Sequence, residues 1–318
     1  MKRRDFIKNS VKATALAAAT GGIGYLFHNR ETTAFQNLVS AGEKSFTVAG
    51  DPQLPQVTLA VNPDHIRALQ AALDAIGGIR RFIQPDEKVV IKPNIGWDRT
   101  PEQAADTNPL LVGEMVRLCL EAGASQVIVT DVTCHQAART FVRSGIGEAA
   151  EKSGARVILP RDEDFIQTDL GGKLLTAWPV LRHFIECDKL INMPIVKHHS
   201  LSTCTIGMKN MYGIIGGRRN QLHQQIDQSI VDLTAFCKPT LTVIDATRVL
   251  LRNGPTGGSL DDVKILNTVI CSTDPVAGDS RGVEFLAHKG VQVGHLRLAE
   301  KSGLGLIDYH QAGYKEIS

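Results

Sequence analysis

The stretch DKLINMPIVKHHSLSTCTIGMKNMYGIIGGRR, residues 188–219, holds the signals that decide how this chain folds. Its apolar run 190–193 is typical of a buried strand, and Pro194 ends the run because proline has no N–H to donate to a sheet. Polar side chains then follow within one expected strand-to-helix connection. They are Lys197, His198, His199, Thr203, Cys204, Thr205, Lys209 and Asn210, with Gly213, Gly216 and Gly217 behind them.

This polar connection has two interpretations. It can be a solvated loop that leads into a helix capped by Ser202 or Thr203. It can instead be a ligand or catalytic site, because open α/β sheets bind ligands at the ends of their strands and functional side chains lie on loops held by a rigid scaffold. The mixture of cations, imidazoles, hydroxyls and glycines favours the site.

Outside this stretch, short apolar runs alternate with segments of helical periodicity. The expected strands are 57–61, 88–91, 126–130, 156–159, 189–193, 241–244 and 268–271. The expected helices are 63–76, with Asn62 as N-cap, then 109–123, 137–152, 205–212, 222–236 and 276–288. Continuous apolar strands between helices indicate an α/β fold, with a mostly parallel sheet covered by helices on both faces. Residues 165–175, with Gly171-Gly172 between two short runs, predict a small hairpin insertion.

Polar residues follow directly after several of the expected strands. They are Lys92 and Asn94, Asp131, Lys197 and His199, Asp245, and Asp274. In a parallel sheet the carboxyl ends of the strands share one edge, so these residues are expected to meet in one crevice.

The same residues resemble a known family. The pattern K-x-H-x5-T-x3-K-N-x2-G, formed by Lys197, His199, Thr205, Lys209, Asn210 and Gly213, is similar to the central motif of the DUF362 family of uncharacterised α/β proteins. Further matches are Lys92-Pro93-Asn94, Thr107-Asn108-Pro109, Gly254-Pro255-Thr256-Gly257-Gly258 and the segment 274–279 from Asp274 to Asp279, in the family's order over about residues 85–285. The resemblance implies one α/β domain over residues 56–318 and gives no specific function. Many members carry an added ferredoxin-like segment, which this chain lacks.

Composition and charge limit the classes of protein. A chain of 318 residues with 43% hydrophobic and 21% charged residues can bury a substantial core. Six scattered cysteines, with no C-x-x-C pair, argue against an iron–sulfur cluster. The net charge of +2 comes from the first 30 residues, and the remainder holds 29 basic and 32 acidic residues. Such a body offers no basic face for nucleic acid.

The N-terminus resembles a twin-arginine (Tat) export signal. Arg3-Arg4 is followed by Phe6 and a weakly apolar run, 11–27, and the alternative is a basic amphipathic start of the domain. We expect residues 1–30 to be a Tat signal or N-terminal anchor and residues 31–55 to be a tether. The resemblance implies engagement of the Tat translocase, folding before export, and a periplasmic or extracytoplasmic location, with membrane anchoring if the signal is not cleaved.

A metal site is one hypothesis for the crevice. His198 and His199 are adjacent, so on an extended segment they point in opposite directions, and the motif selects His199. His199 and His223, with Asp245 or Asp131, form a reasonable ligand set for a divalent metal. The alternative is that each histidine is a hydrogen-bonded structural residue.

An anion site is the other hypothesis. Lys92, Lys197 and Lys209 suit a carboxylate or phosphate, and apolar neighbours of Lys209 would lower its pKa and make it a base or nucleophile. The loop 254–258 lacks the Lys-Ser/Thr of a P-loop and is expected to be a rigid turn or lid. The expected catalytic residues are Lys197, His199 and Lys209. The expected ligand-binding residues are Lys92, Asn94, Asp131, Thr205, Asn210, Asp245, Asp274 and Asp279.

The sequence leaves two functions open. The first is an exported enzyme or cofactor protein that acts on a small anion, and the second is a non-catalytic binding protein that uses the same crevice. Hydrolase and dinucleotide-binding motifs are absent from the sequence. A short motif also resembles the nickel-pincer lactate racemases, in which a histidine precedes the cofactor-bearing lysine at a spacing like that from His199 to Lys209. It would imply proton or hydride chemistry on a hydroxy acid.

Overall fold

The computed structural model describes residues 39–40 and 46–317. The expected Tat signal, residues 1–30, lies outside the described residues, as do residues 31–38 and 41–45 of the expected tether. Both stay predictions. The last part of the tether segment packs on the domain, where Phe46 is buried in the core. Within the described residues, no helix is long and apolar enough to cross a membrane.

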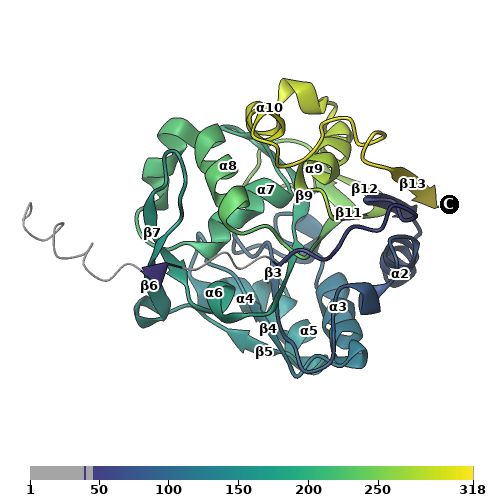
Figure 1. Ribbon diagram of the computed structural model, residues 1–318, viewed down its shortest axis with the longest axis horizontal. Coiled ribbons are helices and arrows are strands. Elements are labelled where there is room, and N and C mark those ends of the chain that lie inside the picture. Colours follow the sequence, from purple (N-terminus) through teal and green to yellow (C-terminus); the bar gives the residue numbers. More distant parts are fainter. Residues whose placement is uncertain (1–38, 41–45, 318) are drawn as a thin grey trace, which may run out of the picture.

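A mixed sheet forms the centre of the fold (Figure 1). Across the sheet its strands are β13 (Tyr314–Ile317), β2 (Val57–Val61), β12 (Val263–Ser272), β11 (Leu241–Leu250), β8 (Lys189–Met193), β3 (Lys88–Pro93), β4 (Gln126–Thr130) and β5 (Arg156–Ile158). The neighbours from β11 to β5 are all parallel. Together with the helices on its faces, this order confirms the predicted α/β fold with a mostly parallel sheet.

The strand β12 departs from the expected direction. It runs antiparallel to both of its neighbours, β11 and β2. β11 and β12 have ten residues each and form a hairpin much longer than the two short parallel strands that the sequence suggests. Because β12 is reversed, its carboxyl end lies at the opposite edge of the sheet from the carboxyl ends of β3 and β4. Asp274, which follows β12, is therefore placed far from the expected crevice.

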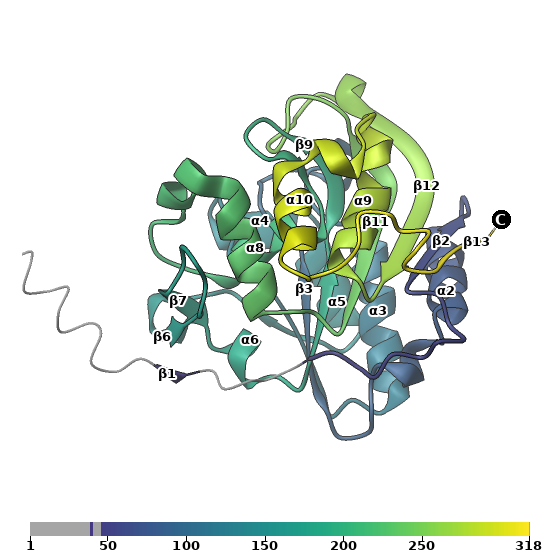
Figure 2. The same cartoon turned by 45° about the horizontal axis from the view of Figure 1, so that its top comes forward.

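Helices cover both faces of the sheet (Figures 1 and 2). They are α2 (His65–Ala75), α3 (Pro109–Ala122), α4 (Ala137–Arg143), α5 (Ile146–Lys152), α6 (His183–Glu186), α7 (Gly207–Asn210), α8 (Ile226–Phe236), α9 (Pro275–Val283) and α10 (Gly294–Lys301). Leu69 of α2 and Val116 of α3 belong to one apolar core, and Ile230 of α8 and Leu296 of α10 belong to another. Burial of these apolar stripes is the main term that holds the layers together.

Local signals set several helix ends. Asp64, rather than the predicted Asn62, caps α2, because its carboxylate accepts the N–H groups of Ile66 and Arg67. The expected helix 137–152 is divided into α4 and α5 at Gly145, whose φ of 72° breaks the helical path. The expected helices 222–236 and 276–288 have regular α structure only over α8 and α9.

A small second sheet confirms the hairpin insertion. β6 (Phe165–Asp169) pairs antiparallel with β7 (Ala177–Leu181), and β1 (Val39–Ser40) pairs with β6. The second strand begins later than the sequence suggests, because the connection between the strands bends back on itself and its backbone donates from Leu174 and Leu175 to Asp232 of α8.

The stretch 188–219 does not form one strand-to-helix connection, and the solvated loop, the less favoured of the two interpretations, is wrong. After β8, β9 (Ile195–His199) pairs with β11 and with β10 (Thr203–Thr205), and α7 and the 3₁₀ helix η5 (Met211–Ile214) follow. Neither Ser202 nor Thr203 caps α7. The carboxylate of Asp279 accepts the N–H groups of Gly207 and Met208 at 2.8 and 2.9 Å. Lys197, His199, Lys209 and Asn210 of this stretch are all buried.

Candidate functional site

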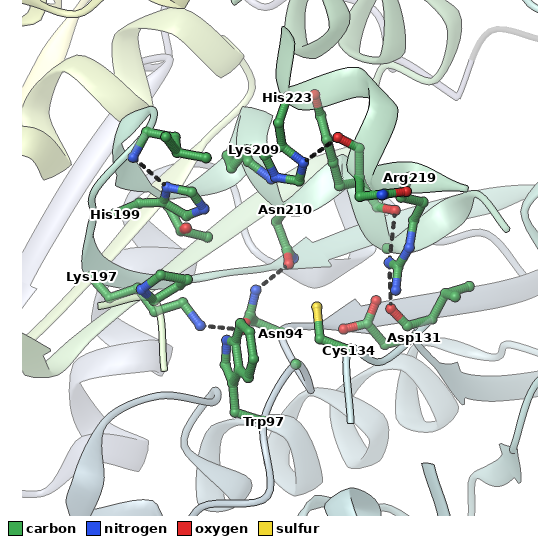
Figure 3. Close-up of a pocket in the computed structure, with 18 of the residues that line it drawn as sticks. Asn94, Trp97, Asp131, Cys134, Lys197, His199, Lys209, Asn210, Arg219 and His223 are labelled. Atoms are coloured by element: carbon green, nitrogen blue, oxygen red, sulfur yellow. Dashed lines mark hydrogen bonds between the residues drawn. The ribbon is translucent and has the colours of Figure 1, made fainter. Parts of the chain in front are cut away.

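A pocket of about 490 Å³ opens beside the carboxyl ends of β3 and β4 (Figure 3). Its walls come from β3, the loop after β4, β9, β10, α7, η5 and the 3₁₀ helix η6 (Arg219–Gln225). Nine residues singled out from the sequence line it: Lys92, Asn94, Asp131, Lys197, His199, Thr205, Lys209, Asn210 and His223. Parallel strands place these distant residues together, because their carboxyl ends share an edge.

Three of the expected ligand-binding aspartates are not in this pocket. Asp245 lies within the long strand β11, where it accepts hydrogen bonds from the Asn108 N–H and from Thr247. Asp274 caps α9 at the other edge of the sheet, and Asp279 holds the start of α7. Backbone N–H groups occupy the carboxylates in all three cases, so these aspartates have structural contacts in place of the expected ligand contacts.

A buried ion pair forms the floor of the pocket. The Lys92 ammonium, which is 0% exposed, donates to Asp131 at 2.7 Å and to the side-chain oxygen of Asn210 at 3.1 Å. The second oxygen of Asp131 accepts the Ile95 N–H at 2.7 Å. Burial lowers the pKa of Lys92, and the Asp131 carboxylate opposes that shift. Both oxygens of Asp131 are therefore engaged by the protein itself.

Gly213 is required by this ion pair. A Cβ atom at position 213 would clash with the Asp131 carboxylate and would lie 2.5 Å from the Lys92 nitrogen. The chain can pass over the pair only without a side chain, which gives a physical reason for the glycine that ends the central motif.

Lys197 is held by a second buried network. Its ammonium donates to the side-chain oxygen of Asn94 at 2.8 Å and to the Ala105 carbonyl. Asn94 in turn donates to Asn210 at 2.8 Å, which links this network to the ion pair. Burial lowers the pKa of Lys197 and raises that of the nearby carboxyl of Asp106, and their opposite charges counteract both shifts.

Lys209 differs from the other two lysines. Its residue is only 7% exposed, and no hydrogen-bond acceptor or carboxylate within the described part of the chain pairs with its ammonium. The ammonium lies 3.5 Å from the centre of the Tyr212 ring, which is a weaker compensation than an anion. Burial lowers the pKa of Lys209 to about 7, and Arg219 and Lys197 add to this effect.

The two pocket histidines present different groups. His199 Nδ1 accepts the backbone N–H groups of Leu201 and Ser202 at 3.1 and 3.3 Å, so in the neutral ring Nε2 carries the proton. His223 Nδ1 donates to the Asn220 carbonyl at 3.2 Å, which leaves the lone pair on Nε2. The rings are stacked with centres 6.4 Å apart. Burial lowers the pKa of His199 to about 3, with Lys209 the next cause, and also lowers that of His223.

This arrangement provides little for a metal. When both histidines are neutral, only Nε2 of His223 has a free lone pair, because Nε2 of His199 carries a proton. Across the residues described by the structure, no group of three or more His, Cys, Asp or Glu side chains is placed to hold a metal ion. A metal at this pair stays an untested hypothesis.

The structure adds residues that sequence reasoning missed. Trp97, Cys134, Tyr212 and Arg219 also line the pocket. Arg219 donates to the carbonyls of Val132 at 2.8 Å and Thr133 at 2.6 Å and so fixes the loop after β4. The sequence signal for Cys134 was its position three residues after Asp131, just past a strand. Among the charged side chains of the lining, four are Lys or Arg and one is Asp, so the pocket is cationic.

The fold and the pocket define an α/β protein with a cationic site at the carboxyl edge of its parallel strands. The family model described as "Domain of unknown function (DUF362)" matches residues 89–284, and the chain belongs to this family.

Individual relatives are more distant. A thylakoid-associated protein of Synechocystis sp. is 26% identical over 215 residues, which cover 63% of this chain and 64% of that protein. The lactate racemase apoprotein of Thermoanaerobacterium thermosaccharolyticum has a TM-score of 0.45 and 13% identity, and a protein from Thermotoga maritima has a TM-score of 0.38 and 12% identity. Each of these structural matches covers 74% of this chain and 58% of the other chain. The chain thus spans less than two thirds of the length of these relatives.

Proposed function

We propose that this protein binds a small anion, a carboxylate or a phosphate, in the pocket, with Lys209 as the principal charged contact. One observation carries the proposal: the Lys209 residue is only 7% exposed, and its ammonium has no anionic partner within the described part of the chain. A buried charge is unfavourable unless it is paired, and proteins keep such groups mainly at functional sites. A bound anion would supply the missing partner.

The surrounding groups support the same ligand class. Lys92 and Lys197 already have acceptors, so neither needs the ligand as a partner. His199 offers an Nε2–H donor and His223 an Nε2 acceptor, which together would suit an anion that also carries a hydroxyl or a protonated oxygen. A pocket of about 490 Å³ has the size of a small-molecule site.

A ligand screen by thermal unfolding tests the proposal. Wild type, Lys209→Met and the matched control Lys301→Met, which changes an exposed lysine of α10, are melted with a panel of small carboxylates and phosphates. A ligand at about 100 times its Kd stabilises the folded state by roughly 2.7 kcal/mol. We expect a melting shift in wild type and Lys301→Met that is absent in Lys209→Met. Equal shifts in all three proteins would remove Lys209 from the site.

A turnover assay distinguishes an enzyme from a non-catalytic binding protein. A protein that consumes an anion from the panel is an enzyme, and one that is stabilised by the anion but leaves it unchanged is a binding protein. The same panel, followed by chromatography of the anion after incubation with wild type, makes this distinction.

A further inference from the structure

Cys134 is the exposed cysteine of the chain. The other five cysteines, Cys119, Cys187, Cys204, Cys237 and Cys271, are all buried. Cys134 lies in the loop after β4 and lines the same pocket as Lys209. In Figure 3 its sulfur points into the pocket, toward the space between Asn94 and Asp131.

The backbone around Cys134 is held in place. The Cys134 N–H donates to the Gly96 carbonyl at 3.0 Å, and the Val132 N–H donates to the Gly213 carbonyl at 2.9 Å. Arg219 binds the carbonyls of the two residues before the cysteine. These contacts fix the thiol on a rigid loop, as expected for a group whose position matters.

The thiol lines the same pocket as the Lys209 ammonium. Burial lowers the pKa of Lys209, and the negative charge of an ionised Cys134 is the largest effect that opposes this shift. An ionised Cys134 also raises the pKa values of Lys197 and Lys92, by less than the nearby aspartates do. A thiolate is the nucleophilic form of cysteine. Independently, Lys209 is 7% exposed and its ammonium has no anionic partner among the described residues, which favours an anion in the same pocket.

We propose that Cys134 is the nucleophile of this pocket and forms a covalent bond to a bound carboxylate that carries an electrophilic carbon within two bonds of its charged group. This inference rests on the proposed anion site. In the simplest balanced step, the sulfur adds to the double bond of an unsaturated carboxylate. A C–S bond forms, the π electron pair moves to the carbon beside the carboxylate, and that carbon takes up the proton lost by the thiol. Nothing leaves, and no oxidant or reductant is required.

Two alkylating reagents test the inference. Iodoacetate carries a carboxylate beside its electrophilic carbon, and iodoacetamide is its neutral analogue. Each reagent alkylates the sulfur through this carbon and releases iodide. The rates of modification at Cys134 are measured by peptide mass spectrometry at about pH 6.5, where the Lys209 ammonium is mostly charged, in buffer without phosphate or carboxylate. Urea-unfolded protein gives the intrinsic ratio of the two rates, and the five buried cysteines report on the integrity of the fold.

The folded protein is expected to raise the iodoacetate-to-iodoacetamide ratio at Cys134 by about tenfold or more above the unfolded value, because a cationic cleft concentrates anions. Lys209→Met should return the ratio to within a few-fold of the unfolded value, whereas Lys301→Met should not change it. An unreactive Cys134, or a ratio equal to that of unfolded protein, would overturn the inference.

The Cys134→Ser variant distinguishes this failure from failure of the anion site. If wild type and Cys134→Ser both show anion-dependent melting shifts while the alkylation ratio is not raised, the anion site stands and the covalent role of Cys134 is wrong. If neither protein shows a melting shift and the ratio is not raised, both proposals fall.

Discussion

Replacement of Lys209 with methionine should stabilise the ligand-free protein. Methionine keeps most of the buried stem of the side chain and removes the ammonium that lacks an anionic partner. The pKa of Lys209 falls from 10.5 to about 7 on folding. At 1.36 kcal/mol for each pKa unit, a difference of about 3.5 corresponds to roughly 5 kcal/mol of destabilisation by the charge in wild type.

The stability difference between Lys209→Met and wild type should depend on pH. Between about pH 7 and 10.5 the unfolded state keeps the Lys209 proton that the folded state has released, so wild-type stability rises with pH in this window. Below pH 7 both states are protonated and the destabilisation is complete. The free energy of unfolding of Lys209→Met should therefore exceed that of wild type by about 5 kcal/mol at pH 6 and by about 2 kcal/mol at pH 9.

Urea unfolding at pH 6, 7, 8 and 9, in buffers free of phosphate and carboxylate, measures the stability difference and its dependence on pH. Trp97 and Trp178 provide the fluorescence signal. Lys301→Met is the control, and its stability should stay within about 0.5 kcal/mol of wild type at every pH, as for other surface substitutions. A destabilised Lys209→Met, or a stability difference that does not vary with pH, would refute the reasoning.

Three further predictions concern other parts of the chain. Asp131→Asn leaves the buried Lys92 ammonium without its counter-ion and should lower the free energy of unfolding by about 3 kcal/mol or more; urea unfolding measures it, and a loss below about 0.5 kcal/mol would contradict the buried pair. Protein purified without an affinity tag should contain substoichiometric zinc or nickel by elemental analysis, whereas a stoichiometric metal that is lost in a folded His199→Ala variant would favour the metal site. Changing Arg3 and Arg4 to lysine should leave folded protein in the cytoplasm, and unchanged export in fractionated cells would reject the Tat signal.

Much of the architecture could be predicted because burial leaves a clear mark on sequence. Strands β3, β4 and β8 are buried on both faces, so each is a continuous apolar run, and helix α3 has Asn108 and Gly123 at its ends. The rule that parallel strands share a carboxyl edge then brings Lys92, Asp131 and Lys197 to one pocket.

Strand direction and burial could not be predicted in the same way. An apolar run has the same composition in either direction, so nothing in residues 268–271 shows that β12 is reversed, and Asp274 was placed at the wrong edge. The polar residues of β9, β10 and α7 left a solvated loop open as an alternative, yet Lys197 is buried with Asn94 as acceptor and Lys209 is buried against the Tyr212 ring. The acceptor of Lys197 comes from a distant segment and is invisible to local periodicity.

The place of Cys134 in the pocket could not be predicted for a different reason. A single cysteine beyond a strand has no distinctive spacing, and its relation to Lys209 exists only after β4 and α7 have been brought together. The signal that could have drawn attention to it was its place at the carboxyl end of a parallel strand, the rule that also selected Asp131.

The protonation of Lys209 in the folded protein is the measurement that tests the central claim most directly. In protein labelled with ¹³C at the lysine Cε position, the resonance that is absent from Lys209→Met identifies this residue. We expect it to titrate near pH 7 without ligand and its midpoint to rise when an anion from the melting screen is added. A midpoint near 10.5, unchanged by every anion, would contradict the account, because it would show an ammonium that is already solvated or paired.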